Sequence, residues 1–217
     1  MGVINMQFNK KALQIYLVAG TQNFAGSDAE FVNHIEQALS NGVTAFQYRE
    51  KGPGSLTGQR KIEMGKKLRK ITTKHHVPLI VDDDVNLANE INADGIHVGQ
   101  SDESVQKIIH DNPNLIVGLS ISTESELEYS KPLIGINYLG IGPIFPTISK
   151  ADAKPPIGIN GLVQLQNQVS LPVVAIGGIN TSNCQSIYQA SKAGIAVISV
   201  IMDSKNVKET IDELERK

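Results

Sequence analysis

The sequence contains few of the residues and segments that mark several classes of protein. Its 217 residues include one cysteine, Cys184, and no tryptophan. A single cysteine excludes an intramolecular disulfide and a four-cysteine zinc site, and it is typical of the reducing cytoplasm, where we expect this protein to act. The longest apolar runs have the length of strands, and the N-terminus lacks an apolar signal segment, so we expect no membrane partner.

An excess of charge of one sign is also lacking. The chain has 20 Lys and Arg against 22 Asp and Glu, which leaves a formal net charge of −2. Domains that bind nucleic acids or acidic membranes usually carry a basic excess, and no long run of Lys and Arg is present here. The composition therefore argues against a nucleic-acid partner.

The chain is long enough to fold without disulfides or a structural metal. With 217 residues, 41% of them hydrophobic, it can bury most of its apolar surface. No linker rich in Pro, Ser or Gly divides it, so residues 1–217 are expected to form one domain. The 19 glycines are scattered, which excludes collagen-like and low-complexity structure and indicates local backbone roles at many separate places.

Short runs of β-branched and aromatic residues alternate with segments of helical spacing. Runs such as residues 173–176 and 195–198 are continuously apolar, as in strands of a parallel sheet that is covered on both faces. The expected strands are residues 15–19, 45–49, 78–82, 95–99, 115–121, 138–144, 172–177 and 195–201.

The segments between these runs predict helices. Ser27-Asp28 is expected to cap the first long helix, and Asn41-Gly42 to end it. Residues 1–14 form an N-terminal extension that is expected to be helical. Further helices are expected over residues 62–71, 85–91 and 105–109, after Ser122, from Thr181, and over 207–214.

Strict alternation of strand and helix permits two architectures, an open doubly wound sheet and a closed barrel. Eight units in about 200 residues is close to the lower size limit of a (β/α)8 barrel. No glycine-rich dinucleotide motif follows the first strand, which also favours the barrel. We therefore expect an α/β protein with a single (β/α)8 TIM-barrel domain, and the open sheet is the alternative.

Cationic side chains lie at the predicted strand ends, where barrels place their catalytic groups. Arg49 and Lys51 lie two residues apart and share a face, and Lys150 lies in the loop after the sixth strand. A guanidinium fork and two ammonium groups suit a pyrophosphate. The alternative is surface charge paired with Glu50 or Asp152.

Carboxylates are expected at the same rim. The third and fourth strands lead to Asp83 and Asp102, close enough to share one cation. Carboxylate oxygens together with substrate phosphate oxygens form the usual Mg²⁺ site. The alternative for each Asp is a helix N-cap, but the neighbouring cations favour a metal-binding role.

The last two strands predict a phosphate site. They end in Gly177-Gly178 and in Ser199, each ahead of an expected helix. Glycines there let backbone N–H groups approach an anion, and this corner is the recurrent phosphate site of barrels. The alternative for the glycine pair is a simple turn.

Other reactive side chains are interpreted as structural. His97, between Ile96 and Val98, is expected to be a hydrogen-bonded core residue. His75-His76 is expected at a helix C-terminus, and Cys184 has no activating base beside it in the sequence. No Ser-His-Asp motif, Walker loop or clustered set of metal-binding histidines is present.

Six motifs fall in order along the chain and together resemble the thiamine-phosphate synthase family. They are Tyr16-Leu-Val, Phe46-Gln-Tyr-Arg-Glu-Lys51, Asp94-Gly-Ile-His-Val-Gly-Gln100 with Asp102, Gly140-Ile-Gly-Pro-Ile-Phe-Pro-Thr147 with Ser149-Lys150-Ala-Asp-Ala153, Val174-Ala-Ile-Gly-Gly-Ile179 and Ala196-Val-Ile-Ser199. The resemblance implies a TIM-barrel transferase of thiamine biosynthesis. Such an enzyme joins 4-amino-5-hydroxymethyl-2-methylpyrimidine diphosphate to 4-methyl-5-(2-hydroxyethyl)thiazole phosphate and releases pyrophosphate with the help of Mg²⁺. It also implies two small phosphorylated substrates as partners, and it is compatible with a homo-oligomer.

The resemblance implies a role for each matching residue. Arg49, Lys51, Ser120 and Lys150 would act in catalysis. The pyrimidine diphosphate would be bound by Gln47, Arg49, Lys51, Asp82, Ser120 and Lys150. The thiazole phosphate would be bound by Thr147, Ser149, Gly178, Ile198 and Ser199. One Mg²⁺ per subunit would be held by Asp83 and Asp102.

The chain departs from the family pattern at three places. Asp82 and Asp84 stand where the family often has Asn and Arg, and Ser149 replaces a Thr. The segment 118–122 lacks the His that often follows the serine, so no acid–base role is assigned there.

The chemistry implied is a dissociative displacement. The pyrimidine amino group donates electrons toward the exocyclic methylene carbon as pyrophosphate leaves, and the thiazole nitrogen then attacks without needing a base. Two alternatives remain. One is a thiazole tautomerase-like isomerase, which would keep a His near the fifth strand, and the other is a catalytically silent phosphate-binding barrel.

Overall fold

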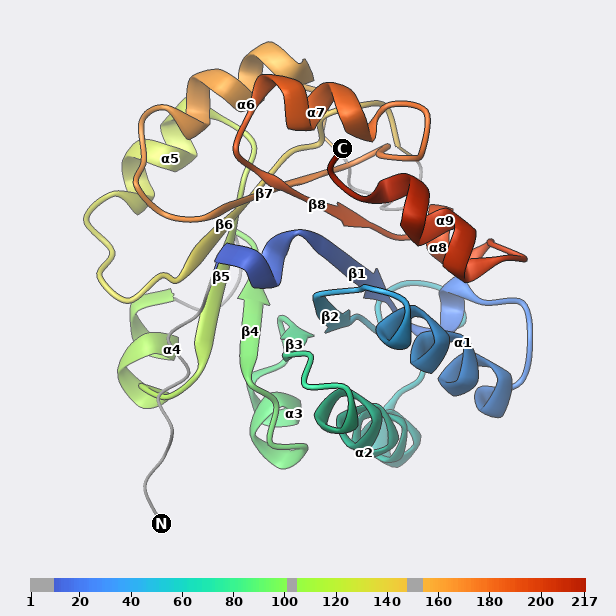
Figure 1. Ribbon diagram of the computed structural model, residues 1–217. Helices are drawn as coiled ribbons and strands as arrows, with labels where there is room; N and C mark the ends of the chain where they lie inside the picture. Colours follow the sequence, from blue (N-terminus) through green and yellow to red (C-terminus); the bar gives the residue numbers. More distant parts are fainter. Residues whose placement is uncertain (1–9, 101–104, 148–153) are drawn as a thin grey trace.

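Eight parallel strands close into a barrel in the computed structural model, which describes residues 10–100, 105–147 and 154–217. The strands pair in chain order, and β8 also pairs with β1, with Ile15 opposite Ile195. This closure excludes the open sheet (Figure 1). The strands are β1 (Ile15–Ala19), β2 (Ala45–Tyr48), β3 (Leu79–Asp82), β4 (Gly95–Val98), β5 (Ile116–Ile121), β6 (Tyr138–Ile141), β7 (Val173–Ile176) and β8 (Gly194–Val197).

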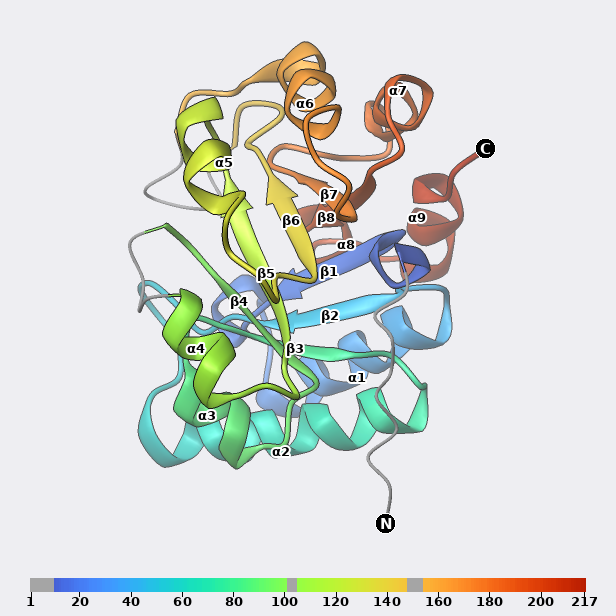
Figure 2. The ribbon, with the colours of Figure 1, turned by 90° about the vertical axis from the view of Figure 1, so that its left-hand side faces the viewer.

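Helices surround the barrel on its outside, so both faces of the sheet are covered (Figure 1). Every residue of β1, β2, β4 and β6 is buried, and three of the four residues are buried in the continuously apolar β7 and in β8. The long helix α2 lies beside α1 and α3 in both ribbon views (Figure 2). The helices are α1 (Asp28–Ser40), α2 (Gly58–Lys74), α3 (Val85–Glu90), α4 (Val105–Asp111), α5 (Glu124–Ser130), α6 (Gly158–Gln166), α7 (Cys184–Ala190), α8 (Ser199–Met202) and α9 (Val207–Leu214). None of these helices, in the part of the chain that the structure describes, is long and apolar enough to cross a membrane.

The predicted caps of α1 are confirmed. The Ser27 hydroxyl accepts a hydrogen bond from the Glu30 N–H, and the Glu30 carboxylate accepts one from the Ser27 N–H at 2.8 Å. This reciprocal capping box satisfies N–H groups that have no partner inside the helix. The helix ends before Asn41, as predicted.

Several segments differ from the prediction. The eighth strand ends at Val197, not at residue 201, and Ser199–Met202 forms the short helix α8. A continuous apolar run has no period that distinguishes a strand from a helix. In the structure, Ile201 and Met202 are buried residues of α8. Helix α6 was not predicted, because Gly158 and Gly161 lower its helical signal. Helix α7 begins at Cys184, three residues after Thr181.

The N-terminal segment packs against the amino-terminal end of the barrel. Lys10–Leu13 form a 3₁₀ turn, η1, that contacts β1, β7 and β8. Leu13 is buried, and the Ile195 N–H donates to the Gln14 carbonyl at 3.1 Å. The predicted helical extension is therefore a 3₁₀ turn in this part, and residues 1–9 lie outside the described residues.

The start of α3 generates a stability prediction. The Asp84 carboxylate accepts a hydrogen bond from the Leu87 N–H at 2.9 Å and pairs with Lys61 Nζ at 2.8 Å. Burial opposes the ionised form, but the hydrogen bonds from Lys61 and Leu87 outweigh it and hold the pKa of Asp84 below its usual value. Asp84→Ala is expected to lower the free energy of unfolding at pH 7 by about 1 kcal/mol. Urea denaturation measures this change.

The control is Asp84→Asn, which keeps the cap and removes only the ion pair, so its loss should be the smaller one. Because the folded pKa is lowered, the contribution of Asp84 is present above pH about 4 and is lost as the pH falls through the folded pKa. The difference between wild type and Asp84→Ala should therefore shrink at acidic pH. Equal losses in the two variants would contradict the capping role.

Candidate active site

A cavity of about 740 Å³ opens at the carboxyl ends of the strands. Sites for small molecules and cofactors usually have volumes of roughly 300–1,000 Å³, so this cavity has the size of a small-molecule site. All eight strand ends converge on one rim, because the strands are parallel and the barrel is closed. Predicted site residues that line the cavity are Arg49, Lys51, Asp82, Asp83, Ser120, Thr147, Gly178, Ile198 and Ser199.

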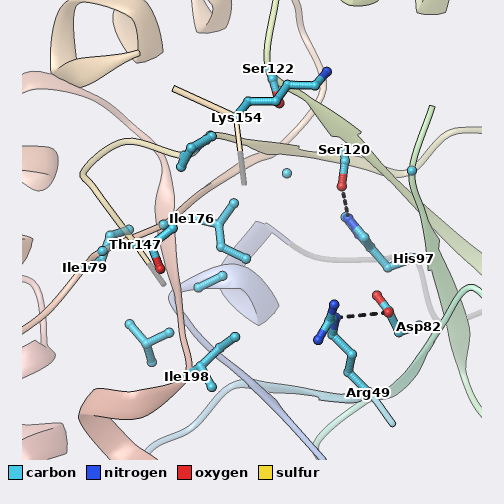
Figure 3. Close-up of a pocket in the computed structure, with 18 of the residues that line it drawn as sticks. Arg49, Asp82, His97, Ser120, Ser122, Thr147, Lys154, Ile176, Ile179 and Ile198 are labelled. Atoms are coloured by element: carbon cyan, nitrogen blue, oxygen red, sulfur yellow. Dashed lines mark hydrogen bonds and ion pairs between the residues drawn. The ribbon is translucent and has the colours of Figure 1, made fainter. Parts of the chain in front are cut away.

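Arg49 is a buried cation on this cavity. Its side chain is 8% exposed, and Nε lies 3.2 Å from Oδ2 of Asp82, whose side chain is 9% exposed. Figure 3 shows the guanidinium reaching into the cavity beside Asp82. A charge removed from water needs a partner of opposite sign. Asp82 supplies that partner for Arg49.

Lys51 and Asp83 form a second pair at the mouth of the cavity, with Nζ 2.7 Å from Oδ2. Asp83 has a φ of +59°, in the left-handed region that few residues other than Gly, Asn and Asp adopt. Its N–H donates to the His97 carbonyl at 2.9 Å. This bond extends the pairing of β3 and β4 by one residue and directs the carboxylate to the rim.

Asp83, one of the two residues predicted to bind a metal ion, lines the cavity. Among the described residues, no group of three or more His, Cys, Asp and Glu side chains could hold one. Asp102, the second predicted ligand, lies outside the described residues. A carboxylate beside substrate phosphates is nevertheless enough for Mg²⁺, which uses one or two carboxylates and fills its other positions with phosphate oxygens and water.

Gln47 lies beneath the cavity. Its side chain is 3% exposed, and Nε2 donates to the Tyr16 hydroxyl at 2.9 Å. It does not line the cavity, although it shares a strand face with Arg49 two residues later. The predicted contact of Gln47 with the pyrimidine diphosphate thus has no support in the described geometry.

His97 is hydrogen-bonded at both ring nitrogens, as the sequence predicts. Nδ1 lies 3.0 Å from the Tyr138 hydroxyl, and Nε2 lies 2.9 Å from Oγ of Ser120. The ring also lines the cavity, where Figure 3 shows it beside Ser120. His97 therefore connects the barrel interior to the site.

The opposite side of the cavity combines glycine backbone with apolar side chains such as Ile179 and Ile198 (Figure 3). Gly177 and Gly178 have φ values of +102° and +65°, and a methyl group on Gly178 would lie 2.4 Å from the Pro146 carbonyl oxygen. Only glycine allows the two loops to approach this closely. The Asn183 amide donates to the Gly178 carbonyl at 2.9 Å and holds the loop. Ile198, which directly precedes α8, lies on the same side (Figure 3), and Ser199 also lines the cavity.

Lys154 and Glu126 also line the cavity and form an ion pair. Neither residue was predicted as part of the site. Glu126 accepts hydrogen bonds from the backbone N–H groups of Ser122 and Thr123, as part of the cap of α5. Burial opposes its ionised form, but Lys154 and these N–H groups outweigh burial and lower the pKa of Glu126. The capping signal after Ser122 located α5, but nothing in the sequence pointed to the distant Lys154.

The predicted residues fall into two groups across the cavity. Arg49, Asp82 and Ser120 lie on one side, and Thr147 and Ile198 lie on the other (Figure 3). The first group comes from the ends of β2, β3 and β5, and the second from the ends of β6 and β8. Ser149 and Lys150, like Asp102, lie outside the described residues.

Comparison with known proteins gives consistent similarities. A family described as thiamine monophosphate synthase matches residues 15–201. The thiamine-phosphate synthase of Leuconostoc citreum is 47% identical over 206 residues, which cover 95% of this chain and 97% of that protein. The thiamine-phosphate synthase of Lactiplantibacillus plantarum is 47% identical over 209 residues, covering 96% of this chain and 95% of that protein. The solved thiamine phosphate pyrophosphorylase of Pyrococcus furiosus superposes with a TM-score of 0.82 at 34% identity, covering 94% of this chain and 95% of its own.

The pairing of Asp82 with Arg49 generates a prediction about anion binding. Asp82→Asn keeps an oxygen near Arg49 but removes the negative charge, so the guanidinium attracts an anion more strongly. The affinity for inorganic pyrophosphate, measured by calorimetry without metal, is expected to rise about ten-fold. The free energy of unfolding is expected to fall by about 1–3 kcal/mol, because a buried charge loses its ionic partner.

The matched control is Asp94→Asn, which weakens the ion pair between Arg69 and Asp94 away from the cavity. It should reduce stability and leave the affinity for pyrophosphate unchanged. An unchanged or weaker affinity for pyrophosphate in Asp82→Asn would show that Asp82 does not restrain the charge of Arg49.

Proposed function

The chain belongs to the thiamine monophosphate synthase family, and from that membership we propose the reaction, the substrates and the metal. It is a transferase of thiamine biosynthesis. We propose that it joins 4-amino-5-hydroxymethyl-2-methylpyrimidine diphosphate to 4-methyl-5-(2-hydroxyethyl)thiazole phosphate. The products are thiamine phosphate and pyrophosphate.

The observation that carries the proposal is a single cavity with two unlike sides. One side presents the buried Arg49 and the nearby Lys51, and the other presents the backbone of Gly177-Gly178 and Ser199. A diphosphate needs several cations, whereas a phosphate monoester is well served by backbone N–H groups. This division supports one substrate on each side, with the reacting atoms between them.

On the cationic side, Arg49 and Lys51 would bind the pyrophosphate group. Arg49 offers a planar fork for two oxygens, and Lys51 adds a point charge at the mouth. The Ser120 hydroxyl lies at the wall beside His97 and would donate to a phosphate oxygen. By the family resemblance, Lys150 would add a further cation.

On the backbone side, Thr147, Gly178, Ile198 and Ser199 would bind the thiazole phosphate, together with Ser149. Loops after the seventh and eighth strands and a short extra helix form the recurrent phosphate site of barrels. Helix α8 has the length and position of such a helix. Holding the thiazole by its phosphate would direct the ring nitrogen toward the other substrate.

The donor set at the cationic side fits Mg²⁺. The Asp83 carboxylate is a hard oxygen ligand at the mouth, and Asp102 would supply a second one. When bound, the ion would neutralise part of the charge of the pyrophosphate group. Asp83 would hold the ion, and Lys51 beside it would contact the phosphate oxygens.

The roles of the protein side chains follow from the charge of the leaving group. Pyrophosphate departs easily only when its developing negative charge is stabilised, and Arg49, Lys51 and Lys150 would do this by fixed position. The amino group of the pyrimidine would stabilise the methylene carbon that pyrophosphate leaves. The attacking thiazole nitrogen carries no proton, so the side chains need only bind and orient both substrates.

One observation favours a second candidate function, a thiazole tautomerase-like isomerase. That activity calls for a His near the fifth strand, and His97 lies 2.9 Å from Ser120 of β5. The buried Arg49 has no task in such an isomerase, because its substrate carries no diphosphate. The synthase therefore accounts for more of the cavity.

The reaction can be tested directly. Purified protein incubated with both phosphorylated substrates and Mg²⁺ is expected to form thiamine phosphate, detected by chromatography after oxidation to thiochrome. Arg49→Ala should reduce kcat/KM by at least about a hundred-fold, because it removes a charge-assisted bidentate contact. Arg60→Ala, which removes an exposed cation paired with Asp28, is the matched control and should retain full activity.

Absence of thiamine phosphate in the wild-type reaction would refute the proposed synthase activity. Turnover of a thiazole phosphate isomer without the pyrimidine substrate would instead support the isomerase.

The metal proposal makes a separate prediction. Asp83→Asn removes one negative charge from the proposed ligand set, so the Mg²⁺ concentration that gives half-maximal rate is expected to rise about ten-fold. Asp84→Asn changes the adjacent residue, whose carboxylate caps α3, and should leave the Mg²⁺ dependence unchanged. An identical Mg²⁺ dependence in Asp83→Asn and wild type would remove Asp83 from the metal site.

A further inference from the structure

A chain of hydrogen bonds crosses the barrel interior and ends at the cavity wall. The Gln47 amide contacts the Tyr16 hydroxyl at 2.9 Å, and that hydroxyl lies 2.9 Å from the Tyr138 hydroxyl. The Tyr138 hydroxyl lies 3.0 Å from His97 Nδ1, and His97 Nε2 lies 2.9 Å from Ser120 Oγ. Figure 3 shows the last bond at the edge of the cavity. Five side chains from β1, β2, β4, β5 and β6 are thus connected.

A glycine in β5 leaves room for these hydrogen-bonded side chains. A methyl group on Gly118 would lie 2.2 Å from Tyr138 Cζ and 2.5 Å from His97 Nδ1. Contacts this short do not occur between real atoms, so a glycine at position 118 is needed for the two rings to meet. The Tyr16 and Tyr138 rings also pack edge to face, with centroids 6.0 Å apart. The arrangement is therefore fixed by packing as well as by hydrogen bonds.

The first hydrogen bond of this series has a fixed donor. The Gln47 Nε2 group can only donate, so the Tyr16 oxygen accepts. Burial raises the pKa of Tyr16 and of Tyr138, so both hydroxyls keep their protons. The Tyr138 oxygen lies within reach of the Tyr16 proton, and the Tyr138 hydroxyl lies 3.0 Å from His97 Nδ1, a distance at which it can donate to the ring.

The same order extends to the imidazole and the serine. With Nδ1 accepting from Tyr138, a neutral ring carries its proton on Nε2, which lies 2.9 Å from Ser120 Oγ and donates to it. In the described part of the chain, Ser120 Oγ has no further hydrogen-bond partner, so its own proton is available to the cavity.

We infer that Tyr138 and His97 are positioning residues that fix the Ser120 hydroxyl as a hydrogen-bond donor into the cavity. The acceptor would be a phosphate oxygen of the pyrimidine diphosphate, so this part of the inference depends on the proposed function. Gln47 donates the first hydrogen bond of this series, which explains why a polar amide lies beneath the cavity. The inference assigns purposes to Tyr16, Tyr138 and His97, which the proposed function leaves without a role.

The order of donors and acceptors in this series of hydrogen bonds can be tested without substrate. Protein labelled with ¹⁵N at its five histidines is expected to show His97 as a single tautomer with the proton on Nε2, read from the two ring nitrogen shifts. The signals of His97 are identified by their loss in His97→Gln. In Tyr138→Phe the donor to Nδ1 is gone, so this tautomer should no longer dominate. A wild-type ring with its proton on Nδ1 would overturn the inference, whatever reaction the protein catalyses.

Kinetics test the consequence for substrate binding. Tyr138→Phe is expected to raise KM for the pyrimidine diphosphate about ten-fold, the effect of one hydrogen bond to an ionised group, while kcat changes less. Tyr16→Phe should have a smaller effect, because Tyr138 can still donate to His97. Loss of packing alone would instead affect both variants alike. Ser120→Ala should raise KM as Tyr138→Phe does, and the double variant should be no worse than Ser120→Ala.

A matched control separates this effect from a general loss of stability. The Tyr188 hydroxyl donates to the Leu214 carbonyl at 3.1 Å on the outside of the barrel, so Tyr188→Phe removes a comparable buried hydroxyl far from Ser120. Its KM should equal that of wild type. Additive effects of Tyr138→Phe and Ser120→Ala, or an equal rise in KM in Tyr188→Phe, would overturn the inference.

Discussion

The pairing of β8 with β1 is the constraint on which the rest of the structure depends. It joins Ile15 to Ile195 and converts a run of parallel strands into a ring. In a ring of parallel strands all carboxyl ends meet at one rim, so residues as far apart as Arg49 and Ser199 line the same cavity. The interior of the ring must also be filled, and here it is filled by tyrosine, glutamine and histidine side chains as well as by apolar ones. Closure thus determines both the cavity and the polar chain beneath it.

Electrostatics divide that cavity. A buried guanidinium is tolerated because Asp82 lies beside it, and this pairing also restrains the charge that an anionic substrate would meet. Lys51 and Asp83 repeat the arrangement in a more exposed position. The opposite wall carries the left-handed glycines Gly177-Gly178, held by Asn183, together with apolar side chains. In the proposed function, these two sides would keep two anions of different charge apart while their reactive ends meet.

The sequence predicts most of the fold because most of its strands are apolar and the cap of α1 is explicit at Ser27. It also predicts which rim carries the polar residues. It fails where one pattern fits two structures, so the apolar run through Ile198 hid the start of α8. The sequence also does not show how far each side chain lies from the cavity. A period of two residues puts Gln47 and Arg49 on one face of the strand, but only Arg49 reaches the cavity. The contacts of His97 with Ser120 and Tyr138 join three strands and could not be read from any local pattern.

The central claim is that the two sides of one cavity bind a diphosphate and a phosphate monoester. A crystal structure of the protein soaked with Mg²⁺, pyrophosphate and thiamine phosphate tests it most directly. The account predicts pyrophosphate against Arg49, Lys51 and Ser120, and the phosphate of thiamine phosphate against the Gly178 and Ser199 backbone. Pyrophosphate on the glycine side, or the phosphate of thiamine phosphate on the Arg49 side, would contradict it.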